Sequence, residues 1–517
     1  MAHSRILEEY ATRRRAHSTG QKAAPANPDV GLAHWVLRVL KQRKKAGKEL
    51  TPENVHDLRT ALRRCLSVED ALSEFDPHPD WKKMKRAAKK LLKNLGGLRD
   101  SDVLLDWLGK LEIAKDKTGA ELRKSIEAER ENFQQEAADA LKNFDQQKWK
   151  SWAAALTPRA DSFSPDSPEL RYVALERWQE AYQRHRFAMR SRSKIGYHRT
   201  RVALKKLRYT VENFLPALKA QWGEAPKQLQ NLLGEVHDLD VLWSKLAALK
   251  PAVEPERKTA WKAAISGERK KRLKQCAAQS SGKNSVWLAW RATLPSGEEL
   301  EKAAVAELAA WSRFRTPEFV HQQRVAALAA ELFEALEARG FTVGLPTERA
   351  RYIVQAAALL EDTGRVEGDK RHHKSSYRLI RKLPLPLGWK PAELQLMAVV
   401  ARYHRKALPQ AKHKEFSVLA STFQQATLLL AGILRLANAL EQAPHVIRKL
   451  HVDVTLEGLM IRAYGFDGEE PLLSKLATAK HLLEIACRRP IVITPGTAGA
   501  PLRVVESKEP KTKSDAA

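Results

Sequence analysis

The stretch "VHDLRTALRR" at residues 55–64 returns almost unchanged as "YHRTRVALKK" at residues 197–206. Each stretch contains a histidine, an arginine three residues later, an Ala-Leu pair and two cations. Residues three and four positions apart share one face of an α-helix, so the histidine and the cations form one stripe and leucines occupy the other side. The pattern predicts two amphipathic helices with their leucines in a bundle core and their charges outside it.

A second pair of matching stretches follows in the same order, with "LGGLRDSDVL" at 95–104 and "LGEVHDLDVL" at 233–242. Helical periodicity dominates residues 31–295, and the proline-rich segment 156–170 divides this region. We therefore predict a duplicated helical domain. Four aspartates in the second pair are expected to cap helices or hold arginines, rather than to bind a metal: Asp100, Asp102, Asp238 and Asp240.

The charge of the chain favours a polyanionic partner. Its 517 residues include 90 Lys and Arg against 61 Asp and Glu, a formal net charge of +29, and basic proteins gain affinity by releasing counterions from phosphate chains. Segments 81–99 and 181–210 contain many cations and no Asp or Glu, whereas solvated helices normally alternate the two signs. Nucleic-acid readers usually add aromatic rings for stacking, and Tyr209 is the nearest candidate here. A phosphate chain without bases is therefore favoured over nucleic acid.

Cysteine use and hydropathy point to a cytoplasmic protein that is not embedded in a membrane. Cys65, Cys276 and Cys487 are odd in number and widely separated, which is not the pattern of a disulfide framework. No apolar run approaches the roughly 18 residues that a membrane-spanning helix needs.

The last third of the sequence predicts a separate unit. It is again helical until residues 451–465, which alternate with period two around Glu457-Gly458 and predict a β-hairpin; residues 488–495 could add a strand. The predicted order along the chain is a basic disordered arm (1–30), a duplicated helical domain (31–295, with halves at about 31–155 and 170–295), a linker (296–315), a mainly helical domain with a small β element (316–495) and a disordered tail (496–517).

The duplicated "HxxRxAL[RK][RK]" motif with its downstream "LGx[LV]xDxDVL" resembles the CHAD (conserved histidine α-helical) domain, over about residues 31–295. The resemblance implies two helical bundles related by a pseudo-twofold axis, with basic helices lining a groove that binds inorganic polyphosphate. The polyphosphate-binding residues and further basic candidates expected on this pattern are His56, Arg59, Arg63, Arg64, Lys89, Lys90, Lys93, Arg99, His198, Arg201, Lys205, Lys206, Arg208 and Lys227.

"HHKSSYRLI" (372–380) and "ARYHRK" (401–406) resemble the C-terminal, HD-type region of the exopolyphosphatase/guanosine pentaphosphate phosphohydrolase family, over about 316–495. HD phosphohydrolases hold a divalent metal with a histidine, a His-Asp doublet and a later aspartate. His321 and Asp362 match this pattern, but Glu361 and Asn438 replace the doublet's histidine and the late aspartate.

The resemblance thus implies a degenerate metal site, in which His321, Glu361 and Asp362 could still hold Mg²⁺ or Mn²⁺, and no cofactor is expected to be required. A second anion pocket is expected from the basic residues His372, His373, Lys374, Arg402, His404, Arg405 and Lys406. The nucleotide-binding domains that carry catalysis in true exopolyphosphatases have no counterpart in the sequence.

We therefore expect a cytoplasmic protein that binds inorganic polyphosphate and can gather at polyphosphate granules, with no catalytic residues assigned. Two alternatives stay open at this point. One is a metal-dependent polyphosphate or nucleotide phosphohydrolase that acts through the HD-like domain, and the other is a nucleic-acid-binding protein.

Overall fold

The computed structural model divides the chain into two compact units, residues 1–294 and 295–517, and each is described separately. The described residues are 31–250, 252–441, 447, 449–465 and 470–496. The predicted basic arm (1–30) and all of the predicted tail except Gly496 lie outside them. None of the described helices combines the length and the apolar character needed to cross a membrane.

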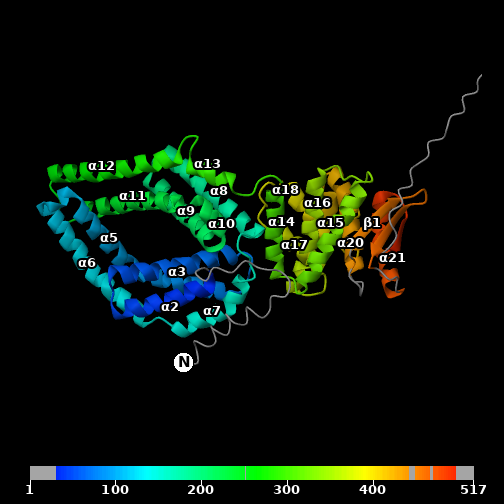
Figure 1. The fold of residues 1–517 in the computed structure, drawn as a ribbon, viewed down its shortest axis with the longest axis horizontal. Helices are drawn as coiled ribbons and strands as arrows, with labels where there is room; N and C mark the ends of the chain where they lie inside the picture. The colour runs from blue at the N-terminus through cyan, green and yellow to red at the C-terminus, as the bar shows by residue number, and fades with distance from the viewer. Residues whose placement is uncertain (1–30, 251, 442–446, 448, 466–469, 497–517) are drawn as a thin grey trace, which may run out of the picture. The chain divides into compact units, whose positions relative to one another are not determined.

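The first unit is built from helices (Figure 1). They are α2 (Leu32–Lys48), α3 (Pro52–Leu72), α4 (Pro79–Asn94), α5 (Gly96–Lys110), η1 (Glu112–Lys115), α6 (Lys117–Lys142), α7 (Gln146–Ala160), α8 (Pro168–Ser191), α9 (Lys194–Phe214), α10 (Pro216–Trp222), α11 (Ala225–Ala247), α12 (Pro255–Ser280) and α13 (Val286–Ala292). The two motif helices begin at side-chain caps, because Thr51 accepts a hydrogen bond from the Asn54 amide and Ser193 accepts one from the Gly196 amide.

The order of packing repeats within this unit. Helix α2 packs on α3 and α5 on α6, just as α8 packs on α9 and α11 on α12. We call α2–α7 the first copy and α8–α13 the second copy. The predicted duplicated helical bundle is therefore confirmed.

Ion pairs between the copies follow the pseudo-twofold relation. Arg64 of α3 pairs with Glu212 of α9, and Lys206 of α9 pairs with Asp70 of α3, where Nζ and Oδ2 are 3.7 Å apart. The sequence repeat aligns Arg64 with Lys206 and Asp70 with Glu212. Each copy therefore supplies the cation of one pair and the acid of the other, as a twofold interface requires.

The copies also share a core at the other end of α5 and α11. Leu104 and Trp107 from α5 pack in one cluster with Leu242 and Leu246 from α11, and Trp261 from α12 is fully buried in it. Each Leu or Trp buried in such a core contributes about 2–3 kcal/mol. The two copies are therefore joined by apolar packing as well as by charge pairs.

The second unit is mainly helical and carries a three-stranded sheet. Its elements are α14 (Glu298–Arg313), α15 (Phe319–Glu337), α16 (Thr347–Leu360), η2 (Thr363–Glu367), α17 (His372–Ile380), α18 (Pro391–Arg402), α19 (Lys414–Ser417), α20 (Ser421–Glu441), β1 (Lys449–Val454), β2 (Leu459–Tyr464), α21 (Glu470–Cys487) and β3 (Ile491–Gly496). Helices α15, α16, α18 and α20 supply most of one continuous apolar core.

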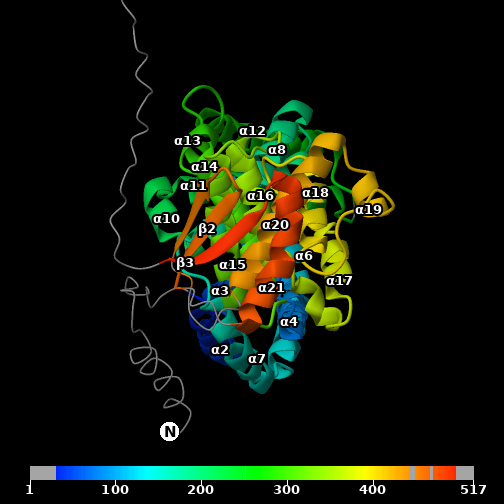
Figure 2. The same cartoon turned by 90° about the vertical axis from the view of Figure 1, so that its right-hand side faces the viewer.

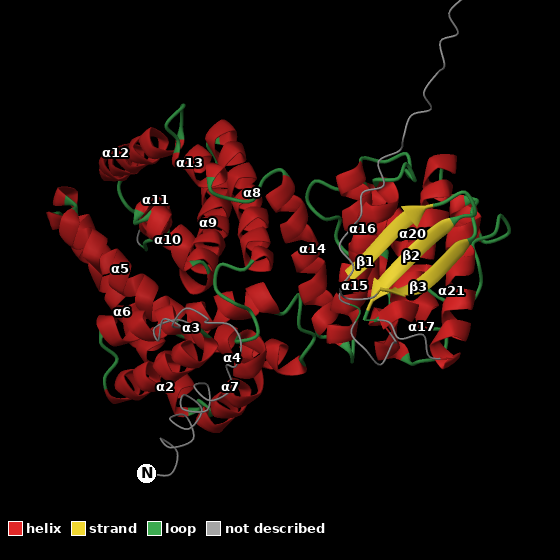
Figure 3. Ribbon diagram, turned by 45° about the vertical axis from the view of Figure 1, so that its right-hand side comes forward, coloured by secondary structure: helices red, strands yellow, loops and turns green. Residues whose placement is uncertain are grey.

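The sheet contains the predicted hairpin. Strands β1 and β2 pair antiparallel, with Val454 opposite Leu459, and β3 pairs parallel with β2 (Figure 3). Helix α21 supplies the crossover and lies along α20 (Figure 2), where Gly432 leaves room for the Leu483 backbone.

The prediction of a linker at residues 296–315 is wrong. Helix α14 occupies most of residues 296–315 and packs on α16. Its Leu308 is fully buried in the core of the second unit, so this segment is part of that unit.

Candidate functional site

The cationic stripes of α3 and α9 meet in the first unit. Arg59 and Arg63 come from α3, and Arg201, Lys205 and Arg208 come from α9. These side chains lie close enough to repel one another across the two copies: Arg201 acts on Arg59, and Arg63 acts on both Arg201 and Lys205. We call these five residues the central cation cluster.

The two arginines of the repeated motif have equivalent surroundings. A Cβ placed on Gly96 would lie 3.7 Å from Arg59 Nη1, and one placed on Gly234 would lie 3.6 Å from Arg201 Nε. These glycines are repeat partners in the "LG" of the second motif. Arg59 also donates a hydrogen bond to the Leu92 carbonyl, at 2.9 Å. The second motif therefore makes room for, and helps to fix, the guanidinium groups of the first.

The two motif histidines are also placed alike. His56 is exposed beside Arg99, and the ring of His198 lies 4.9 Å from that of His237. Partial burial and the neighbouring cations lower the pKa of His56, His198 and His237. His237 was not among the predicted site residues, although the sequence repeat aligns it with Arg99, which was.

The acids of the second motif divide into two roles. Asp102 Oδ1 accepts a hydrogen bond from Arg130 Nε of α6 at 2.7 Å, and its repeat partner Asp240 accepts one from Arg269 Nε of α12 at 3.1 Å. These two aspartates hold arginines, as predicted. The predicted helix caps do not form, because all four aspartates lie within α5 and α11 and not at their first residues.

The other two acids lie near the cation cluster. Asp100 and Asp238 offset part of its charge, since Asp100 acts on Arg59 and Asp238 on Arg201. Burial raises the pKa of Asp238 to about 6, so this counter-ion loses its charge as the pH falls through 6.

The cluster is strained electrostatically. Burial and the four neighbouring arginines Arg63, Arg201, Arg208 and Arg59 lower the pKa of Lys205 from 10.5 to about 6. Burial and Arg63 lower that of Arg59 to about 10. An anion between α3 and α9 would relieve this repulsion.

Other predicted binding residues lie outside the cluster. Arg64 and Lys206 form the ion pairs between the copies, and the Lys227 ammonium pairs with Glu224 at 3.1 Å. Three further candidates are exposed on α4: Lys89, Lys90 and Lys93. Arg64 in particular has a structural role, because its side chain is only 15% exposed.

The second unit does not assemble the HD-type metal set. His321 Nδ1 lies 3.8 Å from Glu441 Oε1, while its neighbour Gln322 donates to Asp362. Asn438 Nδ2 donates to Glu361 Oε1 at 2.5 Å. Burial and Asp362 raise the pKa of Glu361 well above its usual value, and a protonated carboxyl is a poor metal ligand.

The predicted residual site of His321, Glu361 and Asp362 is therefore corrected: only Asp362 of the three is presented as a ligand. This set does not fit a metal, and we derive no step from it.

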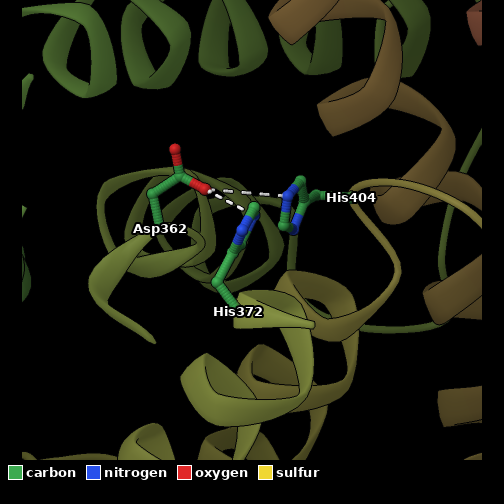
Figure 4. Close-up of side chains that lie close together, drawn as sticks. All are labelled: Asp362, His372 and His404. Atoms are coloured by element: carbon green, nitrogen blue, oxygen red, sulfur yellow. Dashed lines mark ion pairs between the residues drawn. The ribbon is translucent and has the colours of Figure 1, made fainter. Parts of the chain in front are cut away.

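Asp362 instead meets two histidines that were assigned to the anion pocket. Asp362 Oδ1 lies 3.0 Å from His372 Nε2 and 3.8 Å from His404 Nε2, and all three residues are buried. Figure 4 shows the carboxylate and the two imidazole rings pointing toward one another. Burial holds the pKa of His404 well below its usual value. Arg405, from the same predicted pocket, reaches His372 Nε2 at 3.4 Å.

The rest of the predicted pocket is separate and open. Four predicted residues line a cavity of about 470 Å³: His373, Lys374, Arg402 and Lys406. Six further residues of its lining were not predicted: Arg371, Ala407, Lys412, His413, Lys414 and Glu415. The predicted anion pocket is thus two features, a basic cavity and a buried Asp-His-His cluster.

Parts of both units match known protein families. Residues 32–247 match the family model of the CHAD domain, and residues 303–454 match that of the Ppx/GppA phosphatase, domain III. A crystal structure of the CHAD domain from the plant Ricinus communis is similar at 20% identity, covering 54% of this chain and 98% of that one with a TM-score of 0.38. No curated protein matches the chain. The chain thus contains a segment that matches the CHAD domain, followed by one that matches domain III of the Ppx/GppA phosphatase.

Proposed function

We propose that this protein binds inorganic polyphosphate in the central cation cluster of its CHAD domain. The observation that carries the proposal is the meeting of cations from both copies at α3 and α9. Their mutual repulsion lowers the pKa of Lys205 to about 6, and a chain of phosphates would supply the missing negative charge. Arginines bind phosphate oxygens through forked hydrogen bonds, and lysine adds point charge.

The aromatic side chains favour a phosphate chain over a nucleic acid. Tyr209, the ring nearest the stripes, is only 6% exposed. The guanidinium groups of Arg64 and Arg208 lie 4.5 and 4.7 Å from its centroid. A covered ring cannot stack on a base, and base stacking is a large part of binding to single strands.

The second unit supports the same substrate class. Its family takes its name from phosphatases. Its open cavity is lined mainly by cations from α17, α18 and the segment around α19, with one acid, Glu415, that pairs with Arg402. We propose that this cavity binds a second part of a polyphosphate chain, and that the protein acts in the cytoplasm or at polyphosphate granules.

Binding to long-chain polyphosphate at increasing KCl tests the proposal. Five contacts predict a slope of log affinity against log salt of about −3 to −4, taking roughly 0.7 per contact as for single-stranded nucleic acids. The double variant Arg63→Gln/Lys205→Gln should bind at least about tenfold more weakly at pH 6, since each charge-assisted hydrogen bond contributes about 1.5–3 kcal/mol. Its slope should be shallower by about 1 to 1.5.

The matched control is Lys262→Gln/Lys274→Gln, which removes the same charge from two exposed lysines of α12. It should keep both the affinity and most of the salt slope. Equal losses in the two double variants would show that net charge, and not the central cation cluster, binds the polyanion.

A further inference from the structure

The buried cluster of Asp362, His372 and His404 has the composition and shape of a metal site. Two neutral imidazoles and one carboxylate are typical ligands of first-row divalent metals. One ligand atom from each residue lies within 4.8 Å of the other two. A metal about 2.0–2.2 Å from each atom needs the ligands roughly 3.3 Å apart in tetrahedral geometry, so a modest inward movement completes the site.

Hydrogen bonds to the backbone orient both histidines for ligation. His372 Nδ1 lies 2.9 Å from the Asp369 carbonyl, and His404 Nδ1 lies 2.8 Å from the Ala401 carbonyl. A carbonyl only accepts, so each Nδ1 is the donor and each neutral ring keeps its lone pair on Nε2. Both Nε2 atoms face Asp362 Oδ1. Three electron-rich atoms that face one another are stabilised by positive charge between them, which a metal ion or a proton can supply.

The carboxylate is held in the same way from outside. Gln322 Nε2 donates to Asp362 Oδ2 at 3.1 Å, and Arg365 Nε lies 2.9 Å from the same oxygen. These contacts leave Oδ1 for a metal, as partners of ligating residues usually do. Two buried oxygens on neighbouring side chains, Gln322 Oε1 and Glu361 Oε2, have no hydrogen-bond partner among the described residues.

We propose that Asp362, His372 and His404 bind one first-row divalent metal ion such as Mn²⁺, Co²⁺ or Zn²⁺. The site shares only Asp362 with the set that the HD pattern implies. In place of His321, Glu361 and Asn438 it uses His372, the first residue of α17, and His404, which follows α18. Arg365 and Arg405 are the cations nearest to it. Arg405 Nη1 lies 3.4 Å from His372 Nε2, so this guanidinium must move aside when a metal binds that nitrogen.

The competing explanation is a proton in place of the metal. If His372 were doubly protonated, its Nε2 would donate to Asp362 and no metal would be needed. Arg405 Nη1 lies 3.4 Å from the same Nε2, and a guanidinium can only donate, so this contact favours an unprotonated Nε2. Metal binding separates the two explanations.

The experiment uses the full chain after removal of metal with EDTA. Calorimetric titration with Co²⁺ should give one saturating equivalent, with visible absorption bands from histidine-ligated cobalt. Mg²⁺ should bind much more weakly, because it prefers oxygen ligands. The variants His404→Gln and Asp362→Asn should bind Co²⁺ at least about a hundredfold more weakly. Removing an outer-shell partner of a ligand already costs up to about that much, and these variants remove a ligand itself.

Matched controls are His321→Gln, at the position that the HD pattern implies, and His373→Gln, the histidine beside the cluster. Both should bind Co²⁺ like the unaltered chain. No saturable binding by the unaltered chain, or loss of binding in His321→Gln and not in His404→Gln, would overturn the proposal. If Asp362→Asn fails to fold, as thermal unfolding will show, His404→Gln decides. Polyphosphate is absent throughout, so the result is independent of the function proposed for the CHAD domain.

Discussion

Lys205 gives a prediction that depends on the two copies meeting as described. Its pKa is about 6 because it is buried among arginines of both motif helices, so only about 3% of it is charged at pH 7.5 in the free protein. A bound polyphosphate chain would favour the ammonium and raise this pKa toward its usual 10.5. Binding should therefore take up a proton.

The sign of the pH dependence follows from these two values. Below pH 6 the free lysine is already protonated, and affinity is greatest. As the pH rises above 6, affinity falls by up to about tenfold per unit, or about 1.4 kcal/mol, until the pKa of the complex is reached. The pKa values of His56, His198 and His237 are lowered from their usual 6.5, so in the free protein these histidines are neutral above pH 7.5.

The assay is the affinity for long-chain polyphosphate between pH 7.5 and 9 at constant ionic strength, with proton uptake measured by calorimetry in two buffers. In Lys205→Arg the guanidinium stays charged. The slope of log affinity against pH should therefore decrease by close to one, and the affinity at pH 8.5 should rise. Lys206→Arg is the control, because this exposed neighbour pairs with Asp70, and its slope should stay unchanged. A slope that persists in Lys205→Arg, or is absent from the unaltered protein, would refute the reasoning.

Two predictions concern stability. Asp76 is buried and accepts hydrogen bonds from Arg159, at 2.5 and 2.6 Å, and from Trp81. Burial alone would raise the pKa of this carboxyl, but the hydrogen bonds have the larger combined effect and hold the pKa below its usual value. Asp76→Asn should lower the free energy of unfolding by about 3–5 kcal/mol at pH 7, and urea titrations should show the difference shrinking as pH falls through the depressed pKa, where the unaltered protein loses the same stabilisation. Arg64→Ala and Glu212→Ala should each lower the free energy of unfolding. The double variant should lose about 1–2 kcal/mol less than the sum of the two single losses, because the two side chains pair between the copies. Additive losses would contradict that pairing.

The fold could be predicted largely because its signals are local. The two motif helices and the hairpin at 449–464 follow from residue periodicity, and the duplication follows from matching the chain with itself. The prediction of a linker at 296–315 was wrong, because it rested on local signals alone. Turn residues at both ends of the segment suggested a linker, but the stretch between them, α14, buries Leu308 against another helix.

The sites were harder to predict because they depend on which way each side chain faces. Arg63 and Arg64 are adjacent and chemically identical, yet a step of about 100° around the helix separates their directions. Arg63 joins the cation cluster, while Arg64 pairs with Glu212 of the other copy. The same step puts Gln322 beside Asp362 in place of His321. No spacing rule brings His372 and His404 together, since 31 residues separate them and packing of α17 on α18 does so.

Competition between long-chain polyphosphate and single-stranded RNA, at matched phosphate concentration and salt, tests the central claim most directly. The covered Tyr209 ring and the cation cluster predict that polyphosphate displaces bound RNA. Displacing bound polyphosphate should need at least about ten times more RNA, a difference equivalent to one charge-assisted hydrogen bond. Arg63→Gln/Lys205→Gln should lose this preference. Equal competition, or tighter binding of RNA, would contradict the assignment of the CHAD domain to polyphosphate.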